Sequence, residues 1–310
     1  MLYLVVTHTN QYGFKHTLFL AFIILIMFFI VFGIEDLLNL QNIFFICSLI
    51  LINFAHVFIY QKQSIEVFNT LQQADKRDSR QEFLASQLLP KHARDKYFNE
   101  SDRNKGIIDR FEKVTMLYSD IKGFTEFSNN KKPSEVVQAL AKLYTRFDQL
   151  VFDINKSLGQ DDPKLYKLYT IGDAYIVLSF VDAKIRDEYK EARTIVKMAE
   201  SMRVAIEEVK KEINYTGLSM RLGIHTGELI GGVVGTDIVR YDIYGIDPKI
   251  GNEMEAGSKE GKINVSEDTM EILKRDEKLP YYFEYNDLIK IEKLGVEKHS
   301  WYIEPIDDES

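Results

Sequence analysis

The chain has 310 residues and a formal net charge of −8, from 39 basic and 47 acidic side chains. This acidic balance excludes the broadly basic surface of a general nucleic-acid binder, so we expect no nucleic-acid partner. Cys47 is the only cysteine, which rules out an intrachain disulfide and fits a reducing compartment.

Two long apolar stretches open the chain. Residues 17–34 and 43–60 contain no Asp, Glu, Lys or Arg. Each is close to the length of ~20 residues that a helix needs to cross a bilayer. We therefore expect an N-terminal segment at 1–16 and two transmembrane helices within 17–60, in contact with membrane lipid. Two buried core helices are the alternative, and the lack of charge disfavours it.

Charges beside these stretches indicate their orientation. Lys15 precedes the first stretch, Lys62 and Lys76 follow the second, and the connection at 35–42 is short and acidic. Because basic residues favour the cytoplasmic side, we expect an integral membrane protein with both ends in the cytoplasm. The connection is too short for a sensory domain, which disfavours a receptor for external ligands.

Residues 61–109 are predicted to form a linker helix followed by a hinge. Side chains recur at spacings of four and three in a heptad pattern, at Val67, Leu71, Ala74, Asp78, Gln81, Ala85 and Leu88. The pattern is typical of a short parallel coiled coil and equally of one solvated helix. Pro90 should end or kink this helix, and the polar stretch 101–109 should form the hinge.

A globular domain is predicted at 110–304, with a tail at 305–310. The expected order is strand, helix, hairpin, helix and a second hairpin around residues 225–228. The corresponding stretches are 114–119, 133–154, 165–170 with 174–180, 185–213, and 218–224 with 229–234. This order predicts an α+β, ferredoxin-like fold with helices on one face of the sheet.

Two aspartates stand out within this domain. Asp120 follows the first strand, and Asp173 lies at the tip of the first hairpin. In the predicted sheet these strands are neighbours, so the two carboxylates should converge and require protonation or a bridging cation. Oxygen ligands of this kind suit Mg²⁺ or Mn²⁺. Gly123 would let backbone N–H groups approach a phosphate nearby. A single such aspartate is more often part of a turn, so the pair carries the functional interpretation.

Four stretches resemble the class III adenylyl and guanylyl cyclases, in the order found in that family. They are VTMLYSDIKGFTEFS at 114–128, YKLYTIGDAYIVLSF at 166–180, MRLGIHTGELIGGVVG at 220–235, and residues 241–266. The run Leu88–His92 is similar to the end of the linker helix that precedes those domains. The resemblance implies a cyclase catalytic domain over 110–304.

The resemblance also implies roles for particular residues. Asp120 and Asp173, with the Ile121 carbonyl, would hold two divalent cations, Mg²⁺ or Mn²⁺, for conversion of ATP or GTP to the 3′,5′-cyclic nucleotide and pyrophosphate. Arg221 would contact the terminal phosphates. The segment that cradles the phosphates would be Gly123, Phe124 and Thr125.

The chain departs from the family pattern at two positions. Lys249 and Glu253 stand where self-sufficient cyclases have a ribose-orienting Asn and an Arg that stabilises transition-state charge. A glutamate there has the wrong sign for catalysis. The run 252–257, NEMEAG, instead resembles the metal-binding half of heterodimeric membrane cyclases. We therefore expect a second cyclase half, in the same longer chain or another subunit, to supply the Asn and the Arg.

Two further positions concern the purine. The resemblance places Tyr169 and Asp242 where family members read the base, and an Asp at the second position usually accompanies adenine. This gives a weak preference for ATP, although in a specialised pair the other half would read the base. The alternative from a different class is a catalytically silent, cyclase-like regulatory or nucleotide-binding subunit. Retention of Asp120, Asp173 and Arg221 disfavours it.

Overall fold

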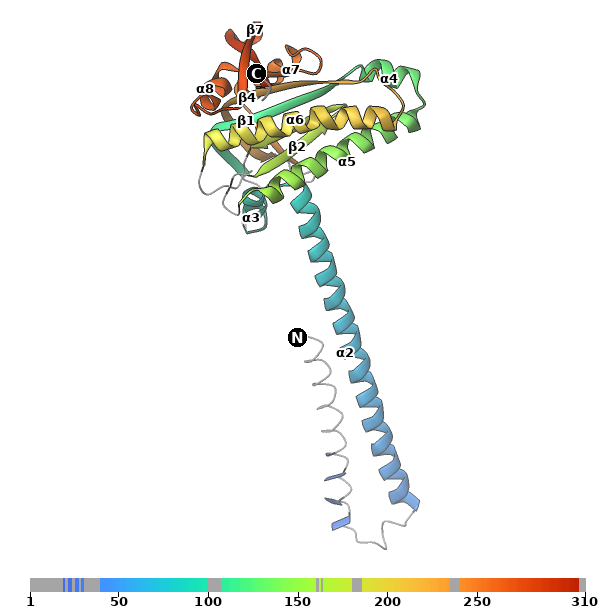
Figure 1. The fold of residues 1–310 in the computed structure, drawn as a ribbon. Coiled ribbons are helices and arrows are strands. Elements are labelled where there is room, and N and C mark those ends of the chain that lie inside the picture. Colours follow the sequence, from blue (N-terminus) through green and yellow to red (C-terminus); the bar gives the residue numbers. More distant parts are fainter. Residues whose placement is uncertain are drawn as a thin grey trace. The chain divides into compact units, whose positions relative to one another are not determined.

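The computed structural model describes residues 19, 22–23, 26–27, 29–30, 40–99, 107–159, 162, 164–179, 186–234 and 240–306 (Figure 1). The chain divides into two compact units, residues 1–84 and residues 85–310.

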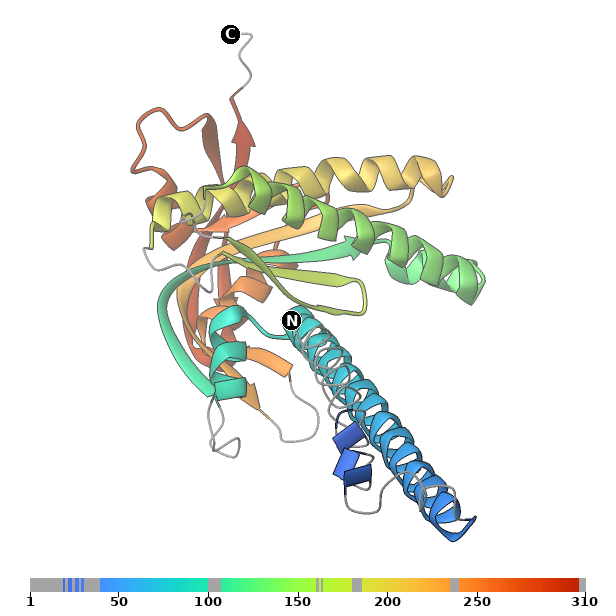
Figure 2. The ribbon, with the colours of Figure 1, turned by 90° about the horizontal axis from the view of Figure 1, so that it is seen from below.

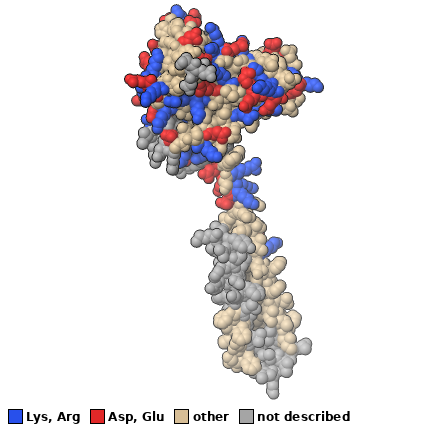
Figure 3. Space-filling view, viewed as in Figure 1, with Lys and Arg blue, Asp and Glu red and all other residues tan. Residues whose placement is uncertain are grey.

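Helix α2 (Leu40–Leu88) contains the second predicted span. Among the described residues its stretch Ile43–Ala85 is the one helix long and apolar enough, by length and composition, to cross a membrane. In Figure 3 the visible face of its first part carries no acidic or basic side chain, in keeping with the sequence 43–60. The first predicted span, 17–34, lies for the most part outside the described residues, so the two-helix hairpin stays a prediction.

The predicted linker helix is the second part of α2. Val67 and Leu71 of the heptad pattern are 58% and 50% exposed, which leaves both the coiled coil and the single helix open. As predicted, the helix ends just before Pro90, and the short helix α3 (Lys91–Asn99) follows. Leu89 and Ala93 beside this break are buried, so α3 is packed onto the domain.

The domain is built on a mixed sheet, and the α+β class is confirmed. Its eight described strands run in the order β2-β3-β1-β4-β6-β8-β7, with β5 paired to β4. Only the β4–β6 pair is parallel among the strand pairs described. The strands are β1 (Ile107–Lys122), β2 (Leu165–Ile171), β3 (Ala174–Ser179), β4 (Ser219–Val234), β5 (Arg240–Tyr244), β6 (Ile263–Ser266), β7 (Tyr281–Ile291) and β8 (Val296–Pro305).

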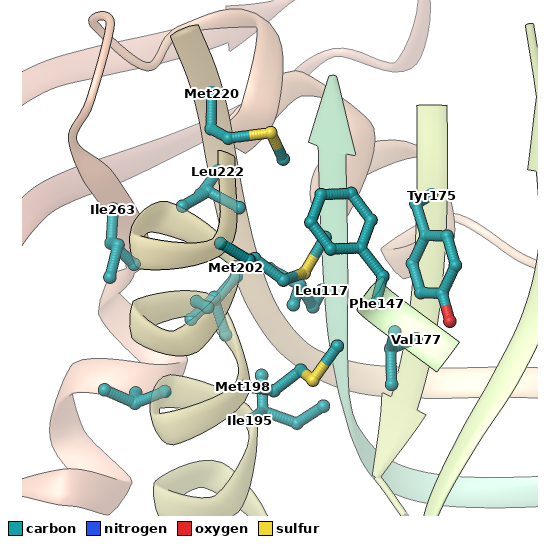
Figure 4. Packing of buried hydrophobic residues seen from close by; sticks show 14 of the residues in the cluster. Leu117, Phe147, Tyr175, Val177, Ile195, Met198, Met202, Met220, Leu222 and Ile263 are labelled. Atoms are coloured by element: carbon teal, nitrogen blue, oxygen red, sulfur yellow. The ribbon is translucent and has the colours of Figure 1, made fainter. Parts of the chain in front are cut away.

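The main hydrophobic core lies between this sheet and two long antiparallel helices. Met198 and Met202 of α6 pack with Phe147 of α5 onto Leu117 and Val177 of the sheet (Figure 4). The apolar positions of both helices recur at helical spacing, as the sequence predicted. The remaining helices of the domain are short. The bounds are α4 (Phe124–Asn130), α5 (Pro133–Ser157), α6 (Glu188–Glu212), α7 (Asp247–Ala256), α8 (Glu267–Leu273) and the 3₁₀ turn η2 (Glu292–Leu294).

The prediction that helices cover one face of the sheet is wrong, because α3 and α7 pack on the other face (Figure 2). Glycines allow the close approach of α7. A Cβ on Gly223 of β4 would stand 2.0 Å from the Glu255 nitrogen, and one on Gly251 of α7 would stand 2.6 Å from the Tyr118 ring. Any larger residue would force the helix away from the sheet. This contact places the last turn of α7 beside the ends of β1 and β4.

The predicted second hairpin is also wrong, because β4 is one continuous strand of 16 residues. The stretch read as a turn stays extended and pairs with β1, with Val114 opposite Gly227. Gly227 serves another purpose, since a Cβ there would lie 2.3 Å from the Asp247 carboxyl carbon. His225 is fully buried and its Nε2 lies 3.2 Å from an Asp247 oxygen. The glycine therefore admits the start of α7 rather than reversing the chain.

Candidate active site

The predicted pair of aspartates is brought together by three adjacent strands. Asp120 lies near the end of β1, and Asp173 occupies the turn between β2 and β3, after Gly172 with its φ of +62°. Strand β3 pairs with β1, which sets Ser119 opposite Tyr175, and the Ser119 hydroxyl donates to the Tyr175 carbonyl at 2.7 Å. The turn is thereby fixed against the strand that carries Asp120.

Burial and a second negative charge both act on Asp173. The pKa of Asp173 is raised, first by burial and then by the negative charge on Asp120, with which it shares a hydrogen bond. The backbone N–H of Ile121 acts in the opposite direction by donating to Asp173. The same surroundings raise the pKa of Tyr144 to about 12, through burial and then the charges of Asp173 and Asp120. Two acidic groups held this close favour a bound cation.

Arg221 lies directly across from Asp120 in the β1–β4 register. Its Nη2 is 2.5 Å from Asp120 Oδ2, and its Nε is 2.9 Å from Glu255 Oε1. Burial lowers the pKa of Arg221, but the hydrogen bond with Asp120 and the charge of Glu255 outweigh it, so the net shift is upward. The predicted phosphate ligand is thus held beside the predicted metal ligands.

Glu255 is a member of this site that the sequence reasoning missed. It lies in the last turn of α7 and is only 8% exposed. Burial raises its pKa to about 7; Arg221 opposes this shift, and the charges of Asp120 and Asp173 add to it. A signal for it existed in the sequence, because Glu255 follows Met254 on the apolar side of α7 that begins at Ile250, where an acidic residue is unexpected.

The segment predicted to cradle phosphates follows β1 without a gap. Gly123 adopts a left-handed conformation at φ +83°, and a Cβ there would meet the Gly217 carbonyl oxygen at 2.2 Å. Only glycine fits this position. Phe124 and Thr125 begin α4 immediately afterwards, and Phe124 packs against the core. Their contact with phosphate stays a prediction.

The two predicted purine-pocket residues also lie together. Burial raises the pKa of Tyr169 to about 12, and the charge of Asp242 and a hydrogen bond to it contribute further. Arg240 joins them: its Nη2 is 2.5 Å from Asp242 Oδ2, and its guanidinium is 4.9 Å from the centre of the Tyr169 ring. Arg240 thus contacts both the Asp242 carboxylate and the face of the Tyr169 ring.

The two departures from the family pattern lie on the outer side of α7. Lys249 is exposed and Glu253 is partly exposed, whereas Ile250 and Met254 are buried against the domain. Glu253 adds to the negative potential at Glu255. It therefore does not replace the positive side chain that self-sufficient cyclases have at this position.

The donor set fits a divalent cation that shares its coordination with substrate. Within the described ranges no group of three or more His, Cys, Asp or Glu side chains is arranged to hold an ion. Mg²⁺ commonly uses only one or two carboxylates and takes its remaining oxygens from water and substrate phosphates. Asp120 and Asp173, two acidic groups that share a hydrogen bond, match that requirement.

Comparisons with known proteins agree with the resemblance. Among curated proteins, the chain is 35% identical over 239 residues to "Guanylate cyclase alpha" of Plasmodium falciparum, covering 75% of this chain and 5% of that protein. It is 34% identical over 214 residues to "Guanylyl cyclase, membrane" of Dictyostelium discoideum, covering 67% of this chain and 13% of that protein. The chain therefore spans a small fraction of the length of these relatives.

Solved structures share the fold. The adenylyl cyclase CyaB from P. aeruginosa has a TM-score of 0.56 at 22% identity, covering 64% of this chain and 96% of that one. The guanylate cyclase domain of RhGC from Catenaria anguillulae, solved in complex with GTP, has a TM-score of 0.53 at 24% identity, covering 64% of this chain and 98% of that one.

The family match extends over the sheet, helices α4 to α8 and the convergent acidic site. Residues 107–304 match the family described as "Adenylate and Guanylate cyclase catalytic domain". With the fold and the order of its motifs in agreement, the chain belongs to the class III nucleotidyl cyclases.

Proposed function

We propose that this chain is the metal-binding half of a membrane nucleotidyl cyclase that converts ATP or GTP to the 3′,5′-cyclic nucleotide and pyrophosphate. The convergence of Asp120, Asp173 and Arg221 carries this proposal. Divalent cations held by the two aspartates and the Ile121 carbonyl would supply charge stabilisation for attack of the ribose 3′-oxygen on the α-phosphorus. Arg221 would bind the terminal phosphates, and the Gly123–Thr125 backbone would position them.

The outer side of α7 supports the need for a second half. Because Lys249 and Glu253 are not buried in this domain, their side chains are available to a partner. The complementary half would bring the Asn and the Arg that this chain lacks, aimed at the acidic site. A purely regulatory subunit would have no use for paired aspartates that destabilise one another, which favours catalysis by a pair over a silent module.

The N-terminal part of the chain supports a membrane location. The exposed apolar side chains of α2, with Phe44 76% and Phe54 70% exposed, require an apolar environment. We propose that this helix crosses a membrane together with the first apolar stretch, and that the catalytic domain lies in the cytoplasm. The positive residues after the second stretch support that orientation.

Affinity purification of the full chain from its own membranes tests the proposed function. We expect a second cyclase half with the missing Asn and Arg to co-purify, and the complex to form cyclic nucleotide from ATP or GTP in the presence of Mg²⁺ or Mn²⁺. A complex that binds nucleotide but produces none, with both halves present, would favour the regulatory alternative.

The preference for ATP or GTP is a separate prediction. Asp242 gave a weak preference for ATP, whereas the relatives are named guanylate cyclases. If the complementary half reads the base, Tyr169→Lys or Tyr169→Glu should change the ratio of kcat/KM for ATP and GTP less than about threefold. The reason is that base discrimination comes from polar groups lining the substrate pocket, where a mismatch costs about 1–3 kcal/mol. A shift of tenfold or more in the reconstituted pair would show that this half reads the base.

A further inference from the structure

Arg221 has two roles that compete for one guanidinium. The proposed function, on which this inference rests, assigns Arg221 to the terminal phosphates of the substrate. In the structure its Nη2 is instead 2.5 Å from Asp120 Oδ2, on the carboxylate assigned to the cations. A guanidinium and a divalent cation compete for such an oxygen, because both are held there by charge.

The surroundings make Arg221 the local counter-ion. Three carboxylates, those of Asp120, Asp173 and Glu255, act on this single guanidinium. The Arg221 side chain is 28% exposed and that of Glu255 is 11% exposed, so solvent screens the group only in part. The positive charge of Arg221 therefore does part of what a cation would do at the site.

The contact with Glu255 is close but poorly aligned. Arg221 Nε and Glu255 Oε1 are 2.9 Å apart, yet neither of these buried atoms makes an aligned hydrogen bond within the described part of the chain. Asp120 accepts a hydrogen bond from Nη2 of the same guanidinium. The arginine is thus drawn toward Asp120 at the expense of its geometry with Glu255, and release from Asp120 would let it align on Glu255.

We propose that Arg221 is a resident counter-ion that occupies Asp120 until a divalent cation displaces it, and that Glu255 is the positioning residue that retains it. Displacement frees the Nη edge of the guanidinium while Glu255 keeps the Nε side at the site. The freed edge is then available to the terminal phosphates of the nucleotide. Cation binding and phosphate binding are coupled in this way through one side chain.

Direct binding of Mn²⁺ to the purified complex without nucleotide, followed by electron paramagnetic resonance, tests the proposal. We expect Arg221→Gln to bind Mn²⁺ at least about tenfold more tightly than wild type, since the competitor is gone. Arg221→Lys keeps the charge but cannot span two carboxylates, and should fall between the two. Lys122→Gln is the matched control, because it removes a positively charged side chain two residues from Asp120 on the same strand. Its Mn²⁺ affinity should change less than about threefold.

Glu255→Gln tests the positioning role. It should leave Arg221 committed to Asp120, so Mn²⁺ binds more weakly and the KM for nucleotide rises several-fold more than kcat falls. Equal effects of Arg221→Gln and Lys122→Gln on Mn²⁺ affinity would overturn the counter-ion proposal. Mn²⁺ binding that is insensitive to Asp120→Asn and Asp173→Asn would instead refute the metal site of the proposed function. The two failures are therefore distinguishable.

Discussion

Asp120→Asn and Asp173→Asn should each reduce cyclic nucleotide formation by the assembled pair by at least about a hundredfold. An amide is a poor ligand for Mg²⁺ and cannot neutralise its charge. The measurement is initial rate at saturating nucleotide over a range of Mg²⁺ and Mn²⁺ concentrations. Either variant retaining activity within a few-fold of wild type would contradict the assignment of the pair to the cations.

Thermal unfolding separates this loss of activity from misfolding. Because the folded state raises the pKa of Asp173, ionisation of Asp173 destabilises the fold, and stability falls as pH rises from the ordinary Asp range through the raised pKa. Asp173→Asn removes that charge, so at neutral pH and without divalent cations its Tm should equal or exceed that of wild type. Asp153→Asn, on the outer face of α5, is a matched control that should leave both activity and Tm unchanged.

Much of the domain was predictable because its signals are local. The apolar spacing of α5 and α6 and the run that became β1 follow directly from side-chain periodicity. The break at Pro90 follows from the missing N–H of proline. The convergence of Asp120 and Asp173 was predictable once their strands were inferred to be neighbours.

Two predictions were wrong, that helices cover one face of the sheet and that residues 225–228 form a hairpin turn. Both have the same physical cause, which is close packing between segments distant in sequence. Gly227 reads as a turn residue but is required by the approach of Asp247, and Gly223 is required by the backbone at Glu255. Nothing in the neighbouring residues shows that a helix from 20 or 30 positions later will lie there. The position of Glu255 beside Met254 was a signal, but its role was not predictable because its partner Arg221 lies on a different element.

Purified alone, the chain should show almost no turnover, roughly a hundredfold or more below the complex with its complementary half. In a pair of identical copies, each copy would offer Glu253 where the opposite site needs the positive side chain of an Arg. It would offer Lys249 where that site needs the amide of an Asn. The double substitution Lys249→Asn with Glu253→Arg restores the expected chemistry at both positions. It should therefore raise the activity of the partner-free chain, whereas Lys259→Asn with Glu260→Arg, a matched exposed pair beyond α7, should not.

The most direct test of the central claim is the rate of cyclic nucleotide formation by the full chain purified without any partner, in lipid and with Mn²⁺. We predict a rate indistinguishable from that of Asp120→Asn, and recovery of turnover when the complementary half is added. Robust Mn²⁺-dependent formation of cyclic AMP or cyclic GMP by the partner-free chain would contradict the account, because the site would then be complete without a second half.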